Sequence, residues 1–209
     1  MDIVITLFSL IVLLFSVVIH ELAHGSVAYS LGDPTAKYQG RLTLNPIKHL
    51  DLFGSVILPL ALLIITGGQG PVFGWAKPVP INPLNLRNQR WDSLKVAIAG
   101  PLSNLAVALL FGLLIRFSPD ILFSIIPGLF LIFSFIVQIN IVLAFFNLIP
   151  IPPLDGHWIL FTFLPDSFSV FKSFLQQYGF FILILIIFFG GLGGLYNVVE
   201  YIFHIITGV

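Results

Sequence analysis

The sequence predicts an all-α membrane protein, a polytopic bundle of helices that crosses the bilayer several times. Two features of the composition carry this prediction: 58% of the 209 residues are hydrophobic, and only 9% are charged. Soluble domains have about 25% charged residues, so a chain this apolar would have too little polar surface to stay in solution. The mean hydropathy of +1.07 also favours the lipid bilayer as the solvent of this chain.

Charge and cysteine content exclude several other kinds of site and partner. The formal net charge is +0, with no basic run and no acidic tail, so no nucleic-acid partner is expected. Cysteine is absent, which excludes disulfides and thiolate zinc sites. Any metal bound by this chain must therefore be held by histidine and carboxylate side chains.

The first apolar run predicts a helix from about Ile3 to Leu31. Gly32 can end this helix in the left-handed conformation, and Pro34 blocks its continuation. No Lys or Arg precedes the apolar run, and no small-residue cleavage site follows it. We therefore expect a permanent helix rather than a cleaved signal peptide.

The region between the first and third helices is expected to be short and partly β-like or re-entrant. Residues Tyr38–Leu44 alternate weakly between apolar and polar side chains, which predicts a short strand. The apolar segment Leu52–Thr66 reaches only about 22 Å as a helix, short of the ~30 Å hydrocarbon core. It would be tilted, re-entrant or matched by a thinner bilayer. The prolines of the loop 67–89 exclude a helix there.

Further apolar segments complete the predicted bundle of about five to six. Two long helices are expected from about Trp91 to Phe117 and from about Ile121 to Leu148, and the tight turn 118–120 makes them antiparallel neighbours. A last apolar region spans 179–206 and is interrupted by the glycines of 190–194. This region forms either one kinked helix or a span followed by an interfacial helix.

Basic residues indicate how the helices are oriented. They form two groups, one after the first helix and one at the start of the third: Lys37, Arg41 and Lys48, then Arg87, Arg90 and Lys95. Because positive flanks favour the cytoplasm, the first helix should run inward and the third outward. The fourth helix then returns to the cytoplasmic side.

The first helix contains the pattern His-Glu-x-x-His of zinc proteases, as His20-Glu21-Leu22-Ala23-His24. Residues four apart share one face of a helix, so both imidazoles can bind one zinc ion. Glu21 lies on the adjoining face, where it can take a proton from a zinc-bound water. The pattern also fits two ordinary histidines of a surface or core helix. Ionisable groups are costly at the end of an apolar helix and are usually functional there, which favours the zinc site.

A catalytic zinc ion needs a third protein ligand and an open fourth position. Asp155 is the best candidate, because it follows the fourth helix on the side where the first helix ends. The prolines before it and Gly156 after it allow an irregular backbone that bends toward a site. The alternative is a turn aspartate that bonds to its own backbone, as Asp-Gly pairs often do.

Three motifs resemble, in this order, the site-2 protease family of intramembrane metalloproteases: His20–Gly25, Ala99–Asn104 and Asn147–Gly156. The stretches Gly40–Pro46 and Trp75–Pro80 are similar to its short bacterial and archaeal members. The resemblance covers roughly 20–156. It implies one zinc ion per chain with His20, His24 and Asp155 as ligands, and Glu21 as the catalytic base.

The sequence departs from the family in two respects. The Asn-Pro pair that often precedes the Asp-Gly motif is separated here into Asn147 and Pro150. Many relatives also carry a PDZ or CBS domain, for which this chain has no room, so delivery or regulation through these domains is not expected.

We therefore expect a single transmembrane protease domain, 1–209, with a metal-site core at about 1–157 and a C-terminal helix region at 179–206. It would hydrolyse peptide bonds within or near transmembrane segments of membrane proteins, with its active site near the cytoplasmic side. The alternative is a membrane protein that binds zinc without cleaving peptides, such as a metal transporter or a catalytically inactive relative. Glu21 argues against it, because transport needs no base between the two histidines.

Two roles are open for Asn104, which lies inside the third helix. Its amide could bind a substrate backbone or an oxyanion, as its place in the family pattern suggests, or it could bond to a neighbouring helix. Asn140 and Asn147 present the same choice between the bundle and a substrate groove. His157 could be a partner of the site or a turn histidine at the membrane interface.

Overall fold

The computed structural model describes residues 3–65, 77–118, 123, 125–126, 128–190 and 193–209. Among these residues all regular structure is helical, as predicted. Four described helices are long and apolar enough to cross a membrane: Phe8–Ser30 within α1 (Ile3–Ser30), α4 (Gln89–Phe117), α6 (Leu129–Asn147), and Asp166–Phe188, which includes α8 (Ser169–Phe188). The first and third predicted helices are thus confirmed to within two residues at either end.

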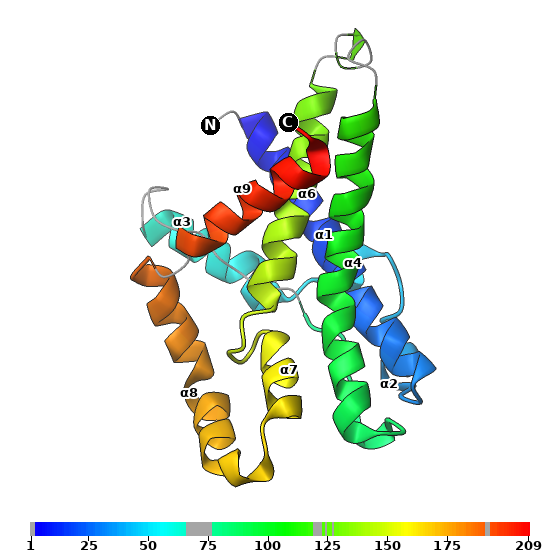
Figure 1. Cartoon of the computed structure of the whole chain (residues 1–209), viewed down its shortest axis with the longest axis vertical. Helices are drawn as coiled ribbons and strands as arrows, with labels where there is room; N and C mark the ends of the chain where they lie inside the picture. The colour runs from blue at the N-terminus through cyan, green and yellow to red at the C-terminus, as the bar shows by residue number, and fades with distance from the viewer. Residues whose placement is uncertain (1–2, 66–76, 119–122, 124, 127, 191–192) are drawn as a thin grey trace.

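Shorter helices connect or cover the long ones. They are α2 (Thr35–Tyr38), η1 (Pro46–His49), the π-helix η2 (Leu52–Ile57), α3 (Leu58–Ile65), η3 (Pro83–Asn85), α7 (Gly156–Phe163), η4 (Asp166–Phe168) and α9 (Gly193–Thr207). The C-terminal apolar region is accordingly divided between α8 and α9, and α9 crosses the bundle obliquely (Figure 1).

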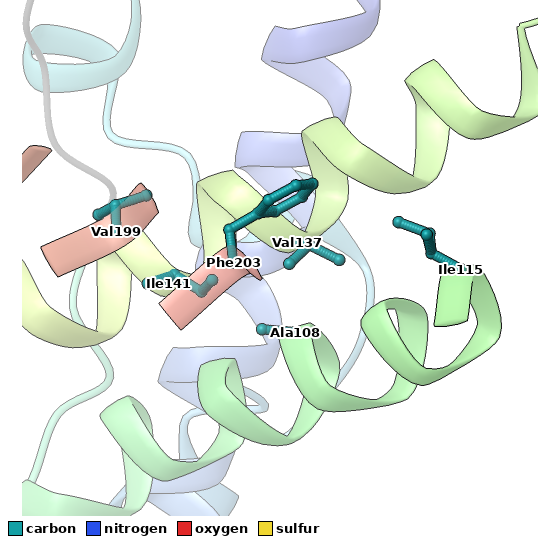
Figure 2. Packing of buried hydrophobic residues seen from close by; sticks show 6 residues of the cluster. All are labelled: Ala108, Ile115, Val137, Ile141, Val199 and Phe203. Atoms are coloured by element: carbon teal, nitrogen blue, oxygen red, sulfur yellow. The ribbon is translucent and has the colours of Figure 1, made fainter. Parts of the chain in front are cut away.

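The core of the bundle lies where α4, α6 and α9 meet. Figure 2 shows its buried side chains pointing toward one another from these three helices: Ala108, Ile115, Val137, Ile141, Val199 and Phe203. Helix α1 packs against α4 and α6 on another side of the pair. Helices α4 and α6 both contact α1 and α9 as well as each other, so this pair forms the centre of the fold.

The strand predicted at Tyr38–Leu44 does not form. Tyr38 is the last residue of α2, and Gly40 turns the chain with a φ of +62°, a conformation that favours glycine. The backbone N–H of Arg41 donates to Ala36, and that of Thr43 donates to Arg41. These local bonds use the groups that a strand would offer to a neighbour.

The second apolar segment forms η2 and α3, and this pair is not among the four long apolar helices. The loop 66–76 that follows lies outside the described residues. The re-entrant path of this region therefore stays a prediction.

The fourth predicted helix does not run unbroken from about Ile121: Phe123 and Ile125 are helical, but the long helix α6 begins only at Leu129. Gly128 precedes it with a φ of +87°, a left-handed conformation that cannot occur inside a right-handed helix. The predicted tight turn 118–120 falls largely outside the described residues, since only Ser118 belongs to them.

Asp33 joins the end of α1 to the loop before α4. Its carboxylate is 1% exposed and accepts hydrogen bonds from the backbone N–H of Asn82 at 2.7 Å and the side-chain amide of Asn85 at 2.8 Å. The backbone N–H and the hydroxyl of Thr35 donate to it as well. Four donors thus converge on one buried acid.

Replacing Asp33 with Asn is expected to destabilise the protein by about 1.5–3 kcal/mol, because the new amide would turn a donor toward donors and remove the charge that strengthens these bonds. Burial opposes ionisation of Asp33, but the bonds from Thr35, Asn85 and Asn82 outweigh it and lower its pKa. Because the pKa of Asp33 is lower in the folded than in the unfolded chain, its ionised form stabilises the folded protein. This stabilisation is fully present above about pH 4 and is lost as the pH falls through the pKa of the folded state.

Thermal unfolding in detergent between pH 7 and pH 3 measures both effects. The difference in unfolding temperature between wild type and Asp33→Asn should shrink as the pH falls. The matched control is Asp166→Asn, since the Asp166 side chain is fully exposed. Equal unfolding temperatures of wild type and Asp33→Asn at pH 7 would contradict this role.

Candidate metal centre

Two histidines of α1 and one distant aspartate meet at a single point of the structure. The Asp155 Oδ2 atom lies 3.0 Å from His20 Nε2 and 3.2 Å from His24 Nε2, and the two Nε2 atoms are 3.0 Å apart. The two histidines are 6% and 5% exposed. Two imidazole nitrogens and a carboxylate oxygen form a donor set that suits zinc.

Helix α1 places the two imidazoles. Because His20 and His24 are four residues apart, they project from one face, and their rings meet edge to face with centroids 4.6 Å apart. The first part of the site therefore depends on local helix geometry alone.

The loop between α6 and α7 delivers Asp155, and Gly156 is what lets it fold. A Cβ at position 156 would lie 2.2 Å from the carbonyl oxygen of Leu148 and 2.5 Å from that of Ile149, so the chain crosses itself with no room for a side chain. Asp155 precedes the first residue of α7, yet its side chain makes no capping hydrogen bond there. Its contacts with His20 and His24 argue against the turn-aspartate alternative.

Hydrogen bonds behind the two imidazoles leave both Nε2 atoms with their lone pairs toward Asp155. His24 Nδ1 lies 2.6 Å from the backbone carbonyl of Val96, which can only accept, so this nitrogen carries the proton. His20 Nδ1 lies 2.6 Å from the side-chain oxygen of Asn104 in the same arrangement. Two lone pairs and a carboxylate within 3.2 Å of one another need a cation among them, and metal-binding histidines are held from behind in this way.

The backbone of α4 leaves room for such an ion at Gly100. A Cβ on Gly100 would lie 2.3 Å from His24 Nε2 and 2.6 Å from His20 Nε2. Every other residue type would place an atom against the nitrogens that face the centre of the site. The donor set and this space together fit a zinc ion.

Glu21 lies in the same pocket and is held by a loop that the sequence analysis did not connect with it. Its Oε2 atom accepts a hydrogen bond of 2.6 Å from the backbone N–H of Val79. Arg41 holds this loop in turn, since its guanidinium donates to the carbonyls of Lys77 at 2.8 Å and Pro78 at 3.2 Å. The prolines around Val79 indicated an extended segment, but no sequence pattern pairs it with Glu21.

The pocket at this site has a volume of about 230 Å³. It lies between the C-terminal half of α1, the start of α4, the Val79 loop and the beginning of α7. The lining residues with a chemical role are His20, Glu21, His24, Val79, Asn147 and Asp155. The pocket therefore borders both Glu21 and the point where the three candidate ligands converge.

The other candidate residues lie in different surroundings. Asn104 is 0% exposed, and its amide bonds to His20, Ser16 and Asn140 in the interior of the bundle, which favours the role between helices. Its predicted contact with substrate stays a prediction. Asn147 lines the pocket. His157 is partly buried and bonds to the carbonyl of Leu154 in the turn beside Asp155.

Comparison with known proteins finds similarity over most of the chain. The model of the family described as Peptidase family M50 matches residues 8–126 and 123–188. Three similar proteins carry the description "Putative zinc metalloprotease". YwhC of Bacillus subtilis is 43% identical over 187 residues, which are 88% of this chain and 80% of the relative.

Two further similar proteins with this description come from other organisms. Rip2 of Mycolicibacterium smegmatis is 30% identical over 94% of this chain and 72% of its own length. MJ0611 of Methanocaldococcus jannaschii is 33% identical over 76% of this chain and 72% of its own length. No solved structure matches the chain with significant similarity.

Proposed function

We propose that this chain, a zinc metalloprotease that belongs to peptidase family M50, the site-2 protease family, hydrolyses peptide bonds within or near transmembrane segments of other membrane proteins. One observation carries the proposal: His20, His24 and Asp155 converge beside Glu21 in a chain with four long apolar helices. A peptidase site built into a membrane-spanning helix has substrates that share its bilayer.

We assign the zinc ion to the Nε2 atoms of His20 and His24 and to the carboxylate of Asp155. Zinc, when bound, acts as a Lewis acid on the peptide carbonyl and lowers the pKa of water. Glu21 takes the proton of the attacking water and passes it to the nitrogen of the departing chain. The N–H of Val79 donates to Glu21 Oε2 and so fixes the orientation of the carboxylate in the pocket.

The substrate must lose helical structure before it can be cut. A helix keeps each carbonyl in its own hydrogen bonds, so the scissile carbonyl becomes available only where the segment unwinds. The pocket of about 230 Å³ beside Glu21 is too small for a helix of 10–12 Å diameter, so it suits an unwound segment of the substrate. Helix-breaking residues in the substrate should therefore speed cleavage.

We place the site near the cytoplasmic side of the membrane. The basic residues Arg41 and Arg90 belong to the flanks of α1 and α4 that the positive-inside tendency assigns to the cytoplasm. Arg41 bonds to the loop that holds Glu21, and Arg90 bonds to the carbonyl of Thr162 in α7, the helix that begins directly after Asp155. These contacts support a site at the basic end of the bundle.

Removal of the metal tests the proposed activity. The protein, purified and reconstituted in liposomes with a single-span membrane substrate, should cleave that substrate, stop when a tight zinc chelator is added, and resume when zinc is restored. Cleavage that continues without zinc, or zinc flux across the liposome without any cleavage, would overturn the proposal.

Replacing Asp155 with Ala is expected to weaken zinc binding by more than about 100-fold, because loss of a ligand exceeds the 10–100-fold effect of losing a ligand's partner. Zinc content at defined free zinc concentrations, measured by elemental analysis, checks this. The control is Asp166→Ala, whose exposed carboxylate should leave zinc content unchanged. An Asp155→Ala protein that keeps wild-type zinc affinity would show that the third ligand is a different residue.

A further inference from the structure

Three buried polar side chains lie behind the metal centre, one each from α1, α4 and α6. Ser16 comes from α1, Asn104 from α4 and Asn140 from α6, and they are 3%, 0% and 0% exposed. Polar groups in the middle of a membrane bundle are costly unless they bond to one another. Only Asn104 touches a candidate ligand, so the purpose of the other two is open.

The direction of the Asn140 amide is set by a backbone carbonyl. Its nitrogen lies 2.8 Å from the carbonyl oxygen of Ile136, which can only accept, and 2.9 Å from the hydroxyl oxygen of Ser16. The NH2 group must therefore face these two oxygens. The oxygen of the Asn140 side chain consequently faces Asn104, where it accepts a bond of 2.9 Å.

The direction of the Asn104 amide follows from the same rule. Its nitrogen donates to the side-chain oxygen of Asn140 and, at 3.2 Å, to the backbone carbonyl of Ser16. Its oxygen is then left to face His20 Nδ1 at 2.6 Å. An amide oxygen cannot donate, so the proton must lie on Nδ1 and the lone pair on Nε2, toward His24 and Asp155.

The opposite amide direction would disable the site. If the NH2 group of Asn104 faced His20, Nδ1 would have to accept, and the proton would move to Nε2, the atom on which a metal ligand needs its lone pair. Asn140 excludes this state, because a flipped Asn104 would set its oxygen against the oxygen of Asn140. The flipped amide would also turn its oxygen toward the backbone carbonyl oxygen of Ser16, so this second acceptor disfavours the flipped state as well.

We propose that Asn140, held by Ser16 and by the carbonyl of Ile136, is a positioning residue that acts through Asn104 to keep His20 in the tautomer that binds zinc. The inference rests on the proposed role of His20 as a zinc ligand. It assigns a function to a residue two hydrogen bonds away from that ligand, on a different helix.

The experiment is a double-mutant cycle read out as zinc affinity. Asn140→Leu should weaken zinc binding by up to about 10-fold, the lower end of the 10–100-fold range for loss of a residue that bonds a metal-binding histidine directly, which here is Asn104. Because Asn140 acts through Asn104, the same substitution in an Asn104→Ala background should change zinc affinity by no more than about 2-fold. Cobalt substituted for zinc should show an altered visible absorption spectrum in Asn140→Leu.

Val137→Ala is the matched control for general loss of stability. Val137 is also 0% exposed and lies on α6 one turn before Ile141, but it bonds to none of these groups. It should lower the unfolding temperature and leave zinc affinity unchanged. Should Asn140→Leu fail to fold, Ser16→Ala removes only one bond of the Asn140 amide and should weaken zinc binding by a few-fold.

Two results would overturn the inference. One is a folded Asn140→Leu protein with wild-type zinc affinity, and the other is an equal loss of affinity from this substitution with and without Asn104. The variant His20→Ala separates this failure from failure of the proposed function. If His20→Ala loses zinc and Asn140→Leu does not, only the inference about Asn140 is wrong. If His20→Ala binds zinc as tightly as the wild type, the proposed metal site is wrong as well.

Discussion

Replacing Glu21 with Gln is expected to stop peptide cleavage almost completely while zinc stays bound. The amide has the shape of the carboxylate but cannot take a proton from water, and loss of a general base costs about 10²–10⁴ in rate. The amide oxygen can still accept the bond from the N–H of Val79, so the loop above the pocket should keep its place. Single-turnover cleavage of a membrane substrate, with zinc content measured on the same sample, checks both statements.

A matched substitution tests whether the effect belongs to the site. Glu200 is an exposed glutamate of α9 whose carboxylate bonds to the hydroxyl of Tyr196, away from the pocket. Glu200→Gln removes the same charge and should leave cleavage unchanged. Cleavage by Glu21→Gln at a rate near that of the wild type would assign the base to another residue.

The second large effect is expected from a single methyl group, in Gly100→Ala. The added Cβ would lie 2.3 Å from His24 Nε2 and 2.6 Å from His20 Nε2, far inside van der Waals contact. Helix α4 cannot easily retreat, because Asn104, one turn further on, bonds to both His20 and the Ser16 carbonyl. The imidazoles must therefore turn away, and the ligand set for zinc is lost.

We expect Gly100→Ala to bind less than a tenth of the zinc of the wild type at equal free zinc, and to cleave at least about 100-fold more slowly, as for loss of a ligand. Gly112→Ala on the same helix is a close control, since its Cβ would lie equally near, at 2.3 Å, but against the Cγ2 methyl of Ile206. Overpacking there should cost about 1–3 kcal/mol of stability and leave zinc content intact. Full zinc occupancy in Gly100→Ala would show that the ion does not lie between α1 and α4.

Several elements of the fold could be predicted because their causes are local. The bounds of α1 follow from an apolar run that ends near Gly32 and Pro34, and α4 follows from an equally long run before Ser118. The strand at Tyr38–Leu44 could not be judged in this way. Weak alternation does not say whether a partner strand exists, and here the turn at Gly40 and local hydrogen bonds use the backbone instead.

The start of α6 illustrates a second limit. The sequence contains a turn signal here, the dipeptide Pro127-Gly128, but the prediction followed the apolar run from about Ile121 and passed over it. The positive φ of Gly128 decides the boundary, and glycine is compatible with that conformation without requiring it. Where a residue such as glycine has several allowed backbone conformations, the packing around it decides which one it adopts.

In the candidate site, too, some features follow from the local sequence and others only from tertiary packing. The pattern His20-Glu21-Leu22-Ala23-His24 by itself determined that two imidazoles share a face, because helix periodicity relates residues four apart without reference to any other part of the chain. Asp155 was a candidate from its place after the fourth helix, but only the folded loop at Gly156 brings its carboxylate within 3.2 Å of both histidines. Likewise, only packing of α4 and α6 against α1 decided which way Asn104 faces and that Gly100 leaves the centre open. Such facts depend on contacts between residues far apart in the chain, and their distances are set by how helices pack, which no periodicity within one segment records.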